Sequence, residues 1–125
     1  MRKKWLKSSI KFISMPRYCL ALDLHNDEKL IAEYEVHHRA VWPAIQQSIL
    51  ESGILDMEIY RTGNRLFMIM DTSEEFSFAG KSALDAANAN VQQWEALMWK
   101  YQLALPWAKP GEKWIRMDRI FSLAK

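Results

Sequence analysis

The stretch RYCLALDLHNDEKLIAEYEVHHRAVWP, residues 17–43, contains the change of pattern that decides the fold. Apolar side chains alternate with others over residues 17–24, which predicts a strand with one buried face. From residue 30 to residue 41 the apolar spacing becomes helical, after Asn26 and Asp27, which can cap a helix. Pro43 disfavours helical geometry in the residue before it. A strand followed by a helix is therefore the first unit that we expect.

The rest of the chain continues this pattern of strands and helices. We expect a helix over 44–51, strands over 54–61 and 66–71, an irregular or helical stretch over 73–87, a helix over 91–103 and a last strand over 113–123. This order predicts an α+β fold, the ferredoxin-like βαββαβ arrangement.

The alternation also predicts two different sheet faces. The face under the helices is expected to carry Leu20, Leu55, Met57, Ile59, Met117 and Phe121. The opposite face is expected to carry Arg17, Asp23, Asp56, Glu58, Arg116 and Asp118. Because a sheet of this size is not expected to leave its second face bare, we expect a homodimer formed through that face.

Length and charge set limits on the class of protein. A chain of 125 residues suits one domain, here residues 15–125, preceded by a basic and poorly ordered extension over 1–14. Five of the 17 basic residues and none of the 15 acidic residues lie in that extension, which leaves a net charge of −3 on the domain. A net-negative domain disfavours nucleic acid as a partner.

The single cysteine and the short apolar runs bear on location. Cys19 cannot form an internal disulfide, so we expect a cytoplasmic protein without a thiolate zinc site. Runs such as residues 66–70 are much shorter than the roughly 20 residues that cross a bilayer, so we expect no membrane partner. No metal-ligand spacing, phosphate loop or nucleophile elbow is present in the sequence, and we expect no metal and no cofactor.

The residues most able to do chemistry are Tyr34 and His38. Their spacing of four residues places both on one helical face, where their polar tips can converge on one ligand. An ordinary amphipathic helix with a partly buried tyrosine and histidine has the same spacing. Trp94 and Trp99 raise a similar choice, because an indole ring can pack on a sugar or simply belong to the core.

The stretch YEVHHRAVWP, residues 34–43, resembles the Tyr-x-x-x-His and Ile/Val-Trp-Pro signature of the L-rhamnose mutarotase family. The resemblance continues in order through Gly53, Tyr60, residues 64–67, residues 99–101 and Pro106. It implies a ferredoxin-like domain that dimerises into an α+β barrel, with no cofactor and a monosaccharide substrate. It also implies a sugar-binding role for Tyr34 and a catalytic role for His38 rather than His37.

The match departs from the family pattern where specificity is decided. Met57 stands where the rhamnose enzymes carry a sugar-contacting tyrosine, and Met98-Trp99 replaces a Trp-Trp pair, with Trp94 nearby. Either tryptophan is therefore a candidate for packing on the sugar, and a related 6-deoxy sugar such as L-fucose is a candidate substrate. Histidine suits mutarotation because its ordinary pKa near 6.5 lets both protonation states exist at neutral pH.

Two other functions are compatible with the same residues. A cofactor-free monooxygenase can share the dimeric barrel, because one fold hosts several chemistries. A non-catalytic carbohydrate-binding module can use Tyr34 and the tryptophans without turnover. Anomer exchange separates the mutarotase from both.

Overall fold

The computed structural model describes residues 15–124, which form one antiparallel sheet covered by helices. The long strands are β1 (Arg17–Leu24), β2 (Ile54–Thr62) and β3 (Arg65–Thr72), in the spatial order β2-β3-β1. Two short strands, β4 (Gln102–Leu103) and β5 (Ile115–Arg116), pair with the other edge of β1. The predicted N-terminal extension over 1–14 lies outside the described residues.

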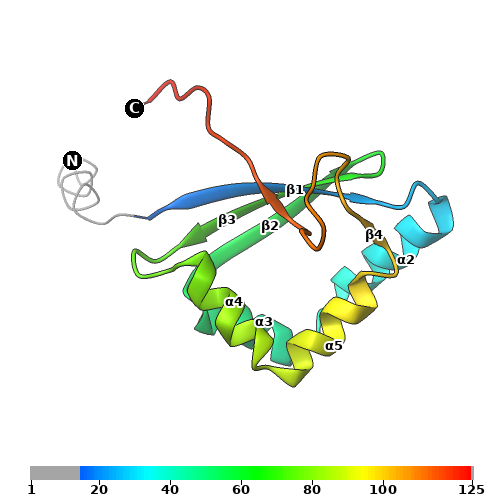
Figure 1. The fold of residues 1–125 in the computed structure, drawn as a ribbon, viewed down its shortest axis with the longest axis horizontal. Helices are drawn as coiled ribbons and strands as arrows, with labels where there is room; N and C mark the ends of the chain where they lie inside the picture. The colour runs from blue at the N-terminus through cyan, green and yellow to red at the C-terminus, as the bar shows by residue number, and fades with distance from the viewer. Residues whose placement is uncertain (1–14, 125) are drawn as a thin grey trace, which may run out of the picture.

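The helices lie in the two crossovers and pack on one face of the sheet (Figure 1). Helices α2 (Glu28–Arg39) and α3 (Pro43–Glu51) connect β1 to β2, while α4 (Phe78–Ala86) and α5 (Ala89–Met98) connect β3 to β4. Asp27 caps α2 by accepting a hydrogen bond from the Leu30 amide at 3.0 Å, and Pro43 begins α3. The predicted ferredoxin-like order is confirmed, although each crossover holds two helices.

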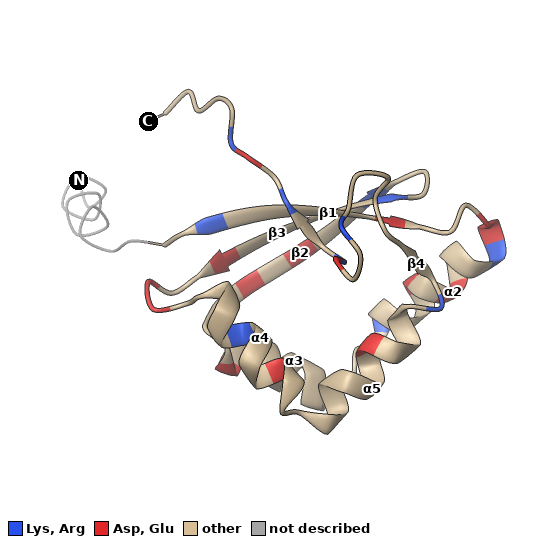
Figure 2. Ribbon diagram, viewed as in Figure 1, with Lys and Arg blue, Asp and Glu red and all other residues tan. Residues whose placement is uncertain are grey.

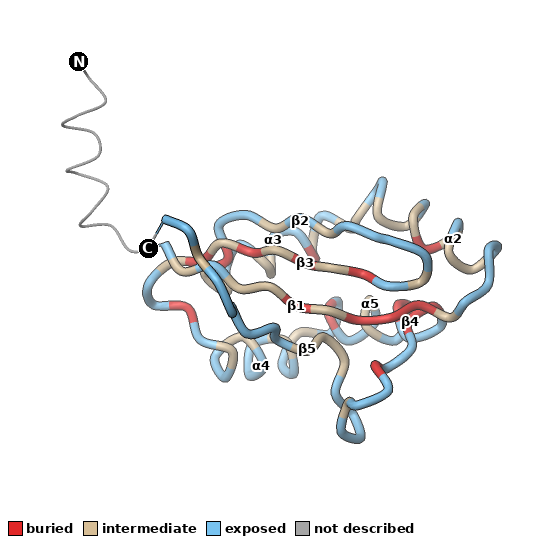
Figure 3. Tube along the Cα trace, turned by 90° about the horizontal axis from the view of Figure 1, so that it is seen from above, coloured by how far each residue is buried: buried red, intermediate tan, exposed pale blue. Residues whose placement is uncertain are grey.

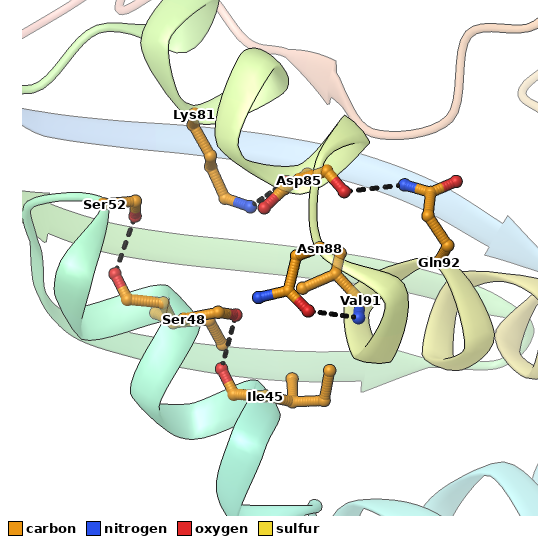
Figure 4. A network of polar contacts seen from close by, with 9 residues as sticks. Ile45, Ser48, Ser52, Lys81, Asp85, Asn88, Val91 and Gln92 are labelled. Atoms are coloured by element: carbon orange, nitrogen blue, oxygen red, sulfur yellow. Dashed lines mark hydrogen bonds and ion pairs between the residues drawn. The ribbon is translucent and has the colours of Figure 1, made fainter.

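Side-chain bonds to the backbone fix the helix ends and the joint between α4 and α5 (Figure 4). Asn88 caps α5 by accepting from the Val91 amide at 3.2 Å. Gln92 donates to the backbone carbonyl of Asp85 at 2.9 Å, and the carboxylate of Asp85 pairs with Lys81. These contacts hold α5 at a fixed angle to α4, and α5 contributes a tryptophan to the candidate site.

Two clusters of buried side chains join the sheet to the helices. The first lies under β1, β2 and β3 and contains Leu20, Ile54, Met68, Met70 and Phe76. The second lies toward α2 and α5 and contains Leu24, Tyr34, Leu66, Met98 and Tyr101. Burial of alternate residues in β1 and β3 produces these clusters, as the period of two predicts.

The predicted inward face of β2 is wrong at Leu55. The pairing with β3 shifts between Ile54 and Asp56, which marks a β-bulge with Leu55 as the extra residue. Ile54 is therefore buried and Leu55 is exposed. Beyond the bulge, Met57 and Ile59 pack against the buried clusters as expected.

The last strand and the last helix are both shorter than predicted. The predicted strand over 113–123 contains only β5, and Met117 and Phe121 are exposed instead of packing under the helices. A strand needs a free edge to pair with, and β4 already occupies part of the β1 edge. Similarly, α5 ends at Met98, since residues 102–103 leave the helix to form β4. Figure 3 shows the exposed C-terminal segment running over the sheet.

None of the helices in residues 15–124 is long and apolar enough to cross a membrane.

The stretch over 73–87, for which the sequence allowed either irregular or helical structure, contains α4. Ser77 caps this helix by accepting a hydrogen bond from the Gly80 amide at 2.9 Å. The strand over 17–24 thus has its predicted bounds, and the other predicted elements have counterparts with changed bounds.

Candidate active site

Helix α2 carries the candidate catalytic pair, and Tyr34 anchors it in the core. Tyr34 is 3% exposed and belongs to the second buried cluster with Leu24 and Met98. His38, one turn later, stacks on the Tyr34 ring with the centroids 4.3 Å apart and the planes tilted by 36°. The predicted pairing of these two side chains is therefore present in the structure.

Helix α5 supplies the other wall around His38. The Trp94 ring meets the imidazole edge-on, with the centroids 5.7 Å apart, and packs in the same way against Trp42 at 5.0 Å. His38 thus lies between a tyrosine and a tryptophan, and Trp42 extends the aromatic wall. Geometries of this kind are favourable for aromatic rings and fix the imidazole plane.

Trp99 lies elsewhere. It follows the last residue of α5, is 41% exposed, and has the ammonium of Lys113 over its ring at 4.8 Å. Among the described aromatic contacts, Trp99 makes none with Tyr34, His38 or Trp94. Of the two tryptophans predicted as sugar platforms, the structure brings only Trp94 to the histidine.

The hydrogen bond of His38 fixes which ring nitrogen carries the hydrogen. Nδ1 lies 2.9 Å from the backbone carbonyl oxygen of Tyr34, and because a carbonyl only accepts, Nδ1 carries the hydrogen and donates it. Burial lowers the pKa of His38, an effect opposed by the bond to Tyr34 and reinforced by His37. At neutral pH the ring is therefore neutral, with a basic Nε2.

The Tyr34 hydroxyl does not turn toward His38. Its oxygen accepts a hydrogen bond from Nε2 of Gln102 at 3.2 Å, from β4. Burial raises the pKa of Tyr34 to about 12, while the bond from Gln102 acts in the opposite direction. Tyr34 is thus a protonated phenol at neutral pH. The expected convergence of the two polar tips is replaced by ring stacking plus a bond to β4.

His37 belongs to a separate polar group. The Tyr101 hydroxyl donates to the Glu33 carboxylate at 3.2 Å, so Nε2 of His37, also at 3.2 Å, donates to the Tyr101 oxygen. Burial and the neighbouring carboxylate raise the pKa of Tyr101. This group ties α2 to the residue that precedes β4, and it engages Nε2 of His37 in a hydrogen bond.

Sequence reasoning missed Gln102 and the Glu33–Tyr101 bond. Both contacts join residues that are 68 positions apart in the chain. No local sequence pattern distinguishes a glutamine such as Gln102, which follows a helical segment, as a functional residue. Tyr101 did belong to the stretch of family resemblance, but its partner could not be inferred from spacing.

Within residues 15–124 there is no group of three or more His, Cys, Asp or Glu that could hold a metal ion. Cys19 is a half-buried free thiol in β1.

One cleft in the described residues lies away from His38. It has a volume of about 1220 Å³ and lies between β1 and the C-terminal segment, where Cys19, Phe67, Trp114 and Phe121 are among its lining residues. It contains no histidine and therefore no candidate acid/base group of the kind found on α2.

Comparison with known proteins finds a matching family and similar chains. The model of the family described as L-rhamnose mutarotase matches residues 17–123. An L-fucose mutarotase of Xanthomonas campestris pv. campestris is 49% identical over 115 residues, which cover 90% of this chain and 92% of that protein. A UPF0734 protein of Dictyostelium discoideum is 33% identical, over 85% and 88% of the two chains.

A solved structure agrees with the fold. The crystal structure of an L-rhamnose mutarotase from Formosa agariphila superposes with a TM-score of 0.64, covering 86% of this chain and 98% of its own, at 21% sequence identity. At that identity the match supports the fold alone.

Proposed function

This chain belongs to the L-rhamnose mutarotase family and is a sugar mutarotase, a carbohydrate isomerase, and from that premise we propose that its substrate is L-fucose, with L-rhamnose second. The relative named for L-fucose aligns along nearly the whole chain, which supports this order. Met57 also supports it, because a changed residue in β2 is suited to a changed pattern of sugar hydroxyls. Neither the monooxygenase nor the non-catalytic binding module is favoured.

His38 is the proposed acid/base residue. To open the ring, the bond between C1 and the ring oxygen breaks, the anomeric hydroxyl loses its proton to become a carbonyl, and the ring oxygen gains a proton. Both oxygens are bonded to C1, so one imidazole nitrogen can accept the first proton and donate it to the ring oxygen. Reclosure on the other face of the carbonyl gives the second anomer.

The observation that carries this role is the bond from Nδ1 to the Tyr34 carbonyl. It leaves Nε2 as the basic nitrogen, while stacking on Tyr34 and contact with Trp94 fix the direction in which Nε2 points. Tyr34 is proposed to orient His38, and Trp94 to pack on the sugar ring. Direct sugar binding by Tyr34 stays a prediction from the family resemblance, since its side chain is buried and its hydroxyl is bonded to Gln102. A cytoplasmic location stays a prediction.

The test is the rate of anomer exchange. Freshly dissolved single anomers of L-fucose, L-rhamnose and their epimers are mixed with purified protein and followed by NMR or polarimetry. We expect faster equilibration with L-fucose than with L-rhamnose, and none above the spontaneous rate with D-glucose. A faster rate with L-rhamnose would reverse the proposed order, and no acceleration with any sugar would contradict the function.

A homodimer formed through the face of the sheet opposite the helices, beside the C-terminal segment that runs over it (Figure 3), is also proposed. Between the buried residues of β1 and β3, Cys19 pairs with Ile69 and Ala21 with Phe67, and all four point away from the helices and are half-buried. Figure 2 shows charged residues toward the ends of β1 and an uncharged middle. A largely apolar stripe of this kind is suited to the same stripe on a second copy.

The mass in solution tests this assembly. We expect light scattering to give twice the mass of the chain, and Ile69→Lys to shift the mass toward that of the monomer, because a charge would be buried in the stripe. Leu84→Lys, at an exposed position of α4, is the matched control and should leave the dimer intact. A monomeric wild type would contradict the proposal.

A further inference from the structure

Gln102 is a buried amide with one hydrogen bond. The residue is 4% exposed, and its Nε2 donates to the Tyr34 hydroxyl oxygen at 3.2 Å. Its Oε1 is buried and has no hydrogen-bond partner within residues 15–124. An unpaired buried carbonyl is destabilising, and each such group in a native protein requires an explanation.

A buried apolar residue would avoid this cost. Methionine has nearly the volume of glutamine and would pack against the second buried cluster without an unpaired atom. The side-chain bond to Tyr34 is what the amide adds over methionine. The presence of a polar side chain at this buried position is therefore best explained by its contact with Tyr34.

Tyr34 transmits that contact to His38 in two ways. Its ring stacks on the imidazole, and its carbonyl accepts the hydrogen of Nδ1. A hydrogen bond at the far end of the phenol limits both tilt and translation of the ring. It therefore limits the positions that the His38 ring can take.

The short strand β4 holds Gln102 in place. Gln102 pairs with Leu24 at the end of β1, and the preceding residue, Tyr101, bonds to Glu33 on α2. Two consecutive residues thus hold neighbouring side chains of α2 from the edge of the sheet. The strand, two residues long, contributes little to the sheet itself but fixes the helix that carries the catalytic pair.

We propose that Gln102 is a positioning residue for mutarotation, which acts on His38 through the Tyr34 hydroxyl. This inference rests on the proposed role of His38. It assigns a function to β4 and explains why a polar side chain occupies a buried position.

The first measurement compares Gln102→Met with wild type on the best sugar of the panel. We expect kcat to fall about tenfold, the worth of one hydrogen bond, with KM changed less than about twofold. The melting temperature should stay close to that of wild type, because the unpaired Oε1 is removed while the buried Tyr34 hydroxyl loses its bond. Gln93→Met, at an exposed position of α5, is the control and should match wild type. Gln102→Leu, which also lacks the amide, repeats the test if the methionine variant does not fold.

The second measurement asks whether Gln102 acts through Tyr34. In a Tyr34→Phe background the hydroxyl is gone, so Gln102→Met should cause no further loss of kcat. Equal losses in both backgrounds would overturn the proposal, and so would full activity of both Gln102 variants. If the wild-type protein accelerates anomer exchange of none of the sugars tested, the proposed function is contradicted, and this inference is contradicted with it.

The third measurement does not depend on activity. We expect NMR signals of the His38 ring to shift in Gln102→Met, and its pKa to rise toward the ordinary value, because a looser ring is better hydrated. Its titratable neighbour is His37, and the α5 side presents Trp94, which carries no charge. Unchanged His38 signals in the variant would overturn the proposal even if the activity fell.

Discussion

Replacing His38 with alanine should reduce catalysed anomer exchange by about 10²- to 10⁴-fold, the range over which a positioned acid/base group accelerates a reaction. The loss should appear in kcat, since the imidazole moves the proton and the ring walls around it remain. Line-broadening or saturation-transfer NMR on the two anomeric protons measures the rate directly at equilibrium.

His37→Ala is the matched control for this prediction. It removes the adjacent histidine on the same helix, but His37 donates to Tyr101 and lies in a different polar group. We expect at most about a threefold loss, reflecting one weakened hydrogen bond. If His37→Ala were inactive and His38→Ala fully active, the assignment of the catalytic histidine would be wrong.

The pH dependence of kcat belongs to the same prediction. Burial lowers the pKa of His38, so the neutral, proton-accepting form is present at neutral pH. As the pH falls through that lowered pKa the ring gains a proton, Nε2 can no longer accept one, and kcat should fall. The midpoint is expected below about 6.5, the ordinary value for histidine, and a midpoint above that value would contradict the buried environment.

The second large effect is expected from Trp94→Leu. Trp94 contacts both His38 and Trp42, so its ring is placed to pack on a sugar held at Nε2. We expect kcat/KM to fall by about tenfold or more, because the aromatic surface facing the sugar is lost and the His38 ring gains freedom. Leucine keeps part of the apolar contact and so preserves the fold better than alanine.

Trp99→Leu provides the comparison for Trp94. Trp99 lies against Lys113 and is not among the aromatic neighbours of His38, so its replacement should change kcat/KM by less than about threefold. Circular dichroism of both variants controls for folding. A larger loss at Trp99 than at Trp94 would show that the sugar binds at the other end of α5.

Local patterns accounted for most of the elements. The strand over 17–24 was predicted at its observed bounds, and the period of two identified its buried residues Leu20, Leu22 and Leu24. The hairpin of β2 and β3 and the helices α2, α3 and α5 were also predicted, with bounds that moved by a few residues at most ends. Each of these depends on residues close together in the chain.

The errors came from pairing between distant segments. A bulge in β2 turned Leu55 outward, and competition for the edge of β1 shortened the last strand to β5. Neither event leaves a signature in periodicity, since both depend on the partner strand. The residues after Met117 alternate like a strand but have no strand to pair with in the described chain.

The sequence by itself determined the α+β fold and the contact between Tyr34 and His38, because a spacing of four residues brings two side chains together on any helix. Only the tertiary structure decided which tryptophan joins them and that Gln102 reaches the Tyr34 hydroxyl. Those contacts join α2 to α5 and β4, more than 50 residues away in the chain. Their geometry follows from the packing of whole elements, which local spacing does not encode.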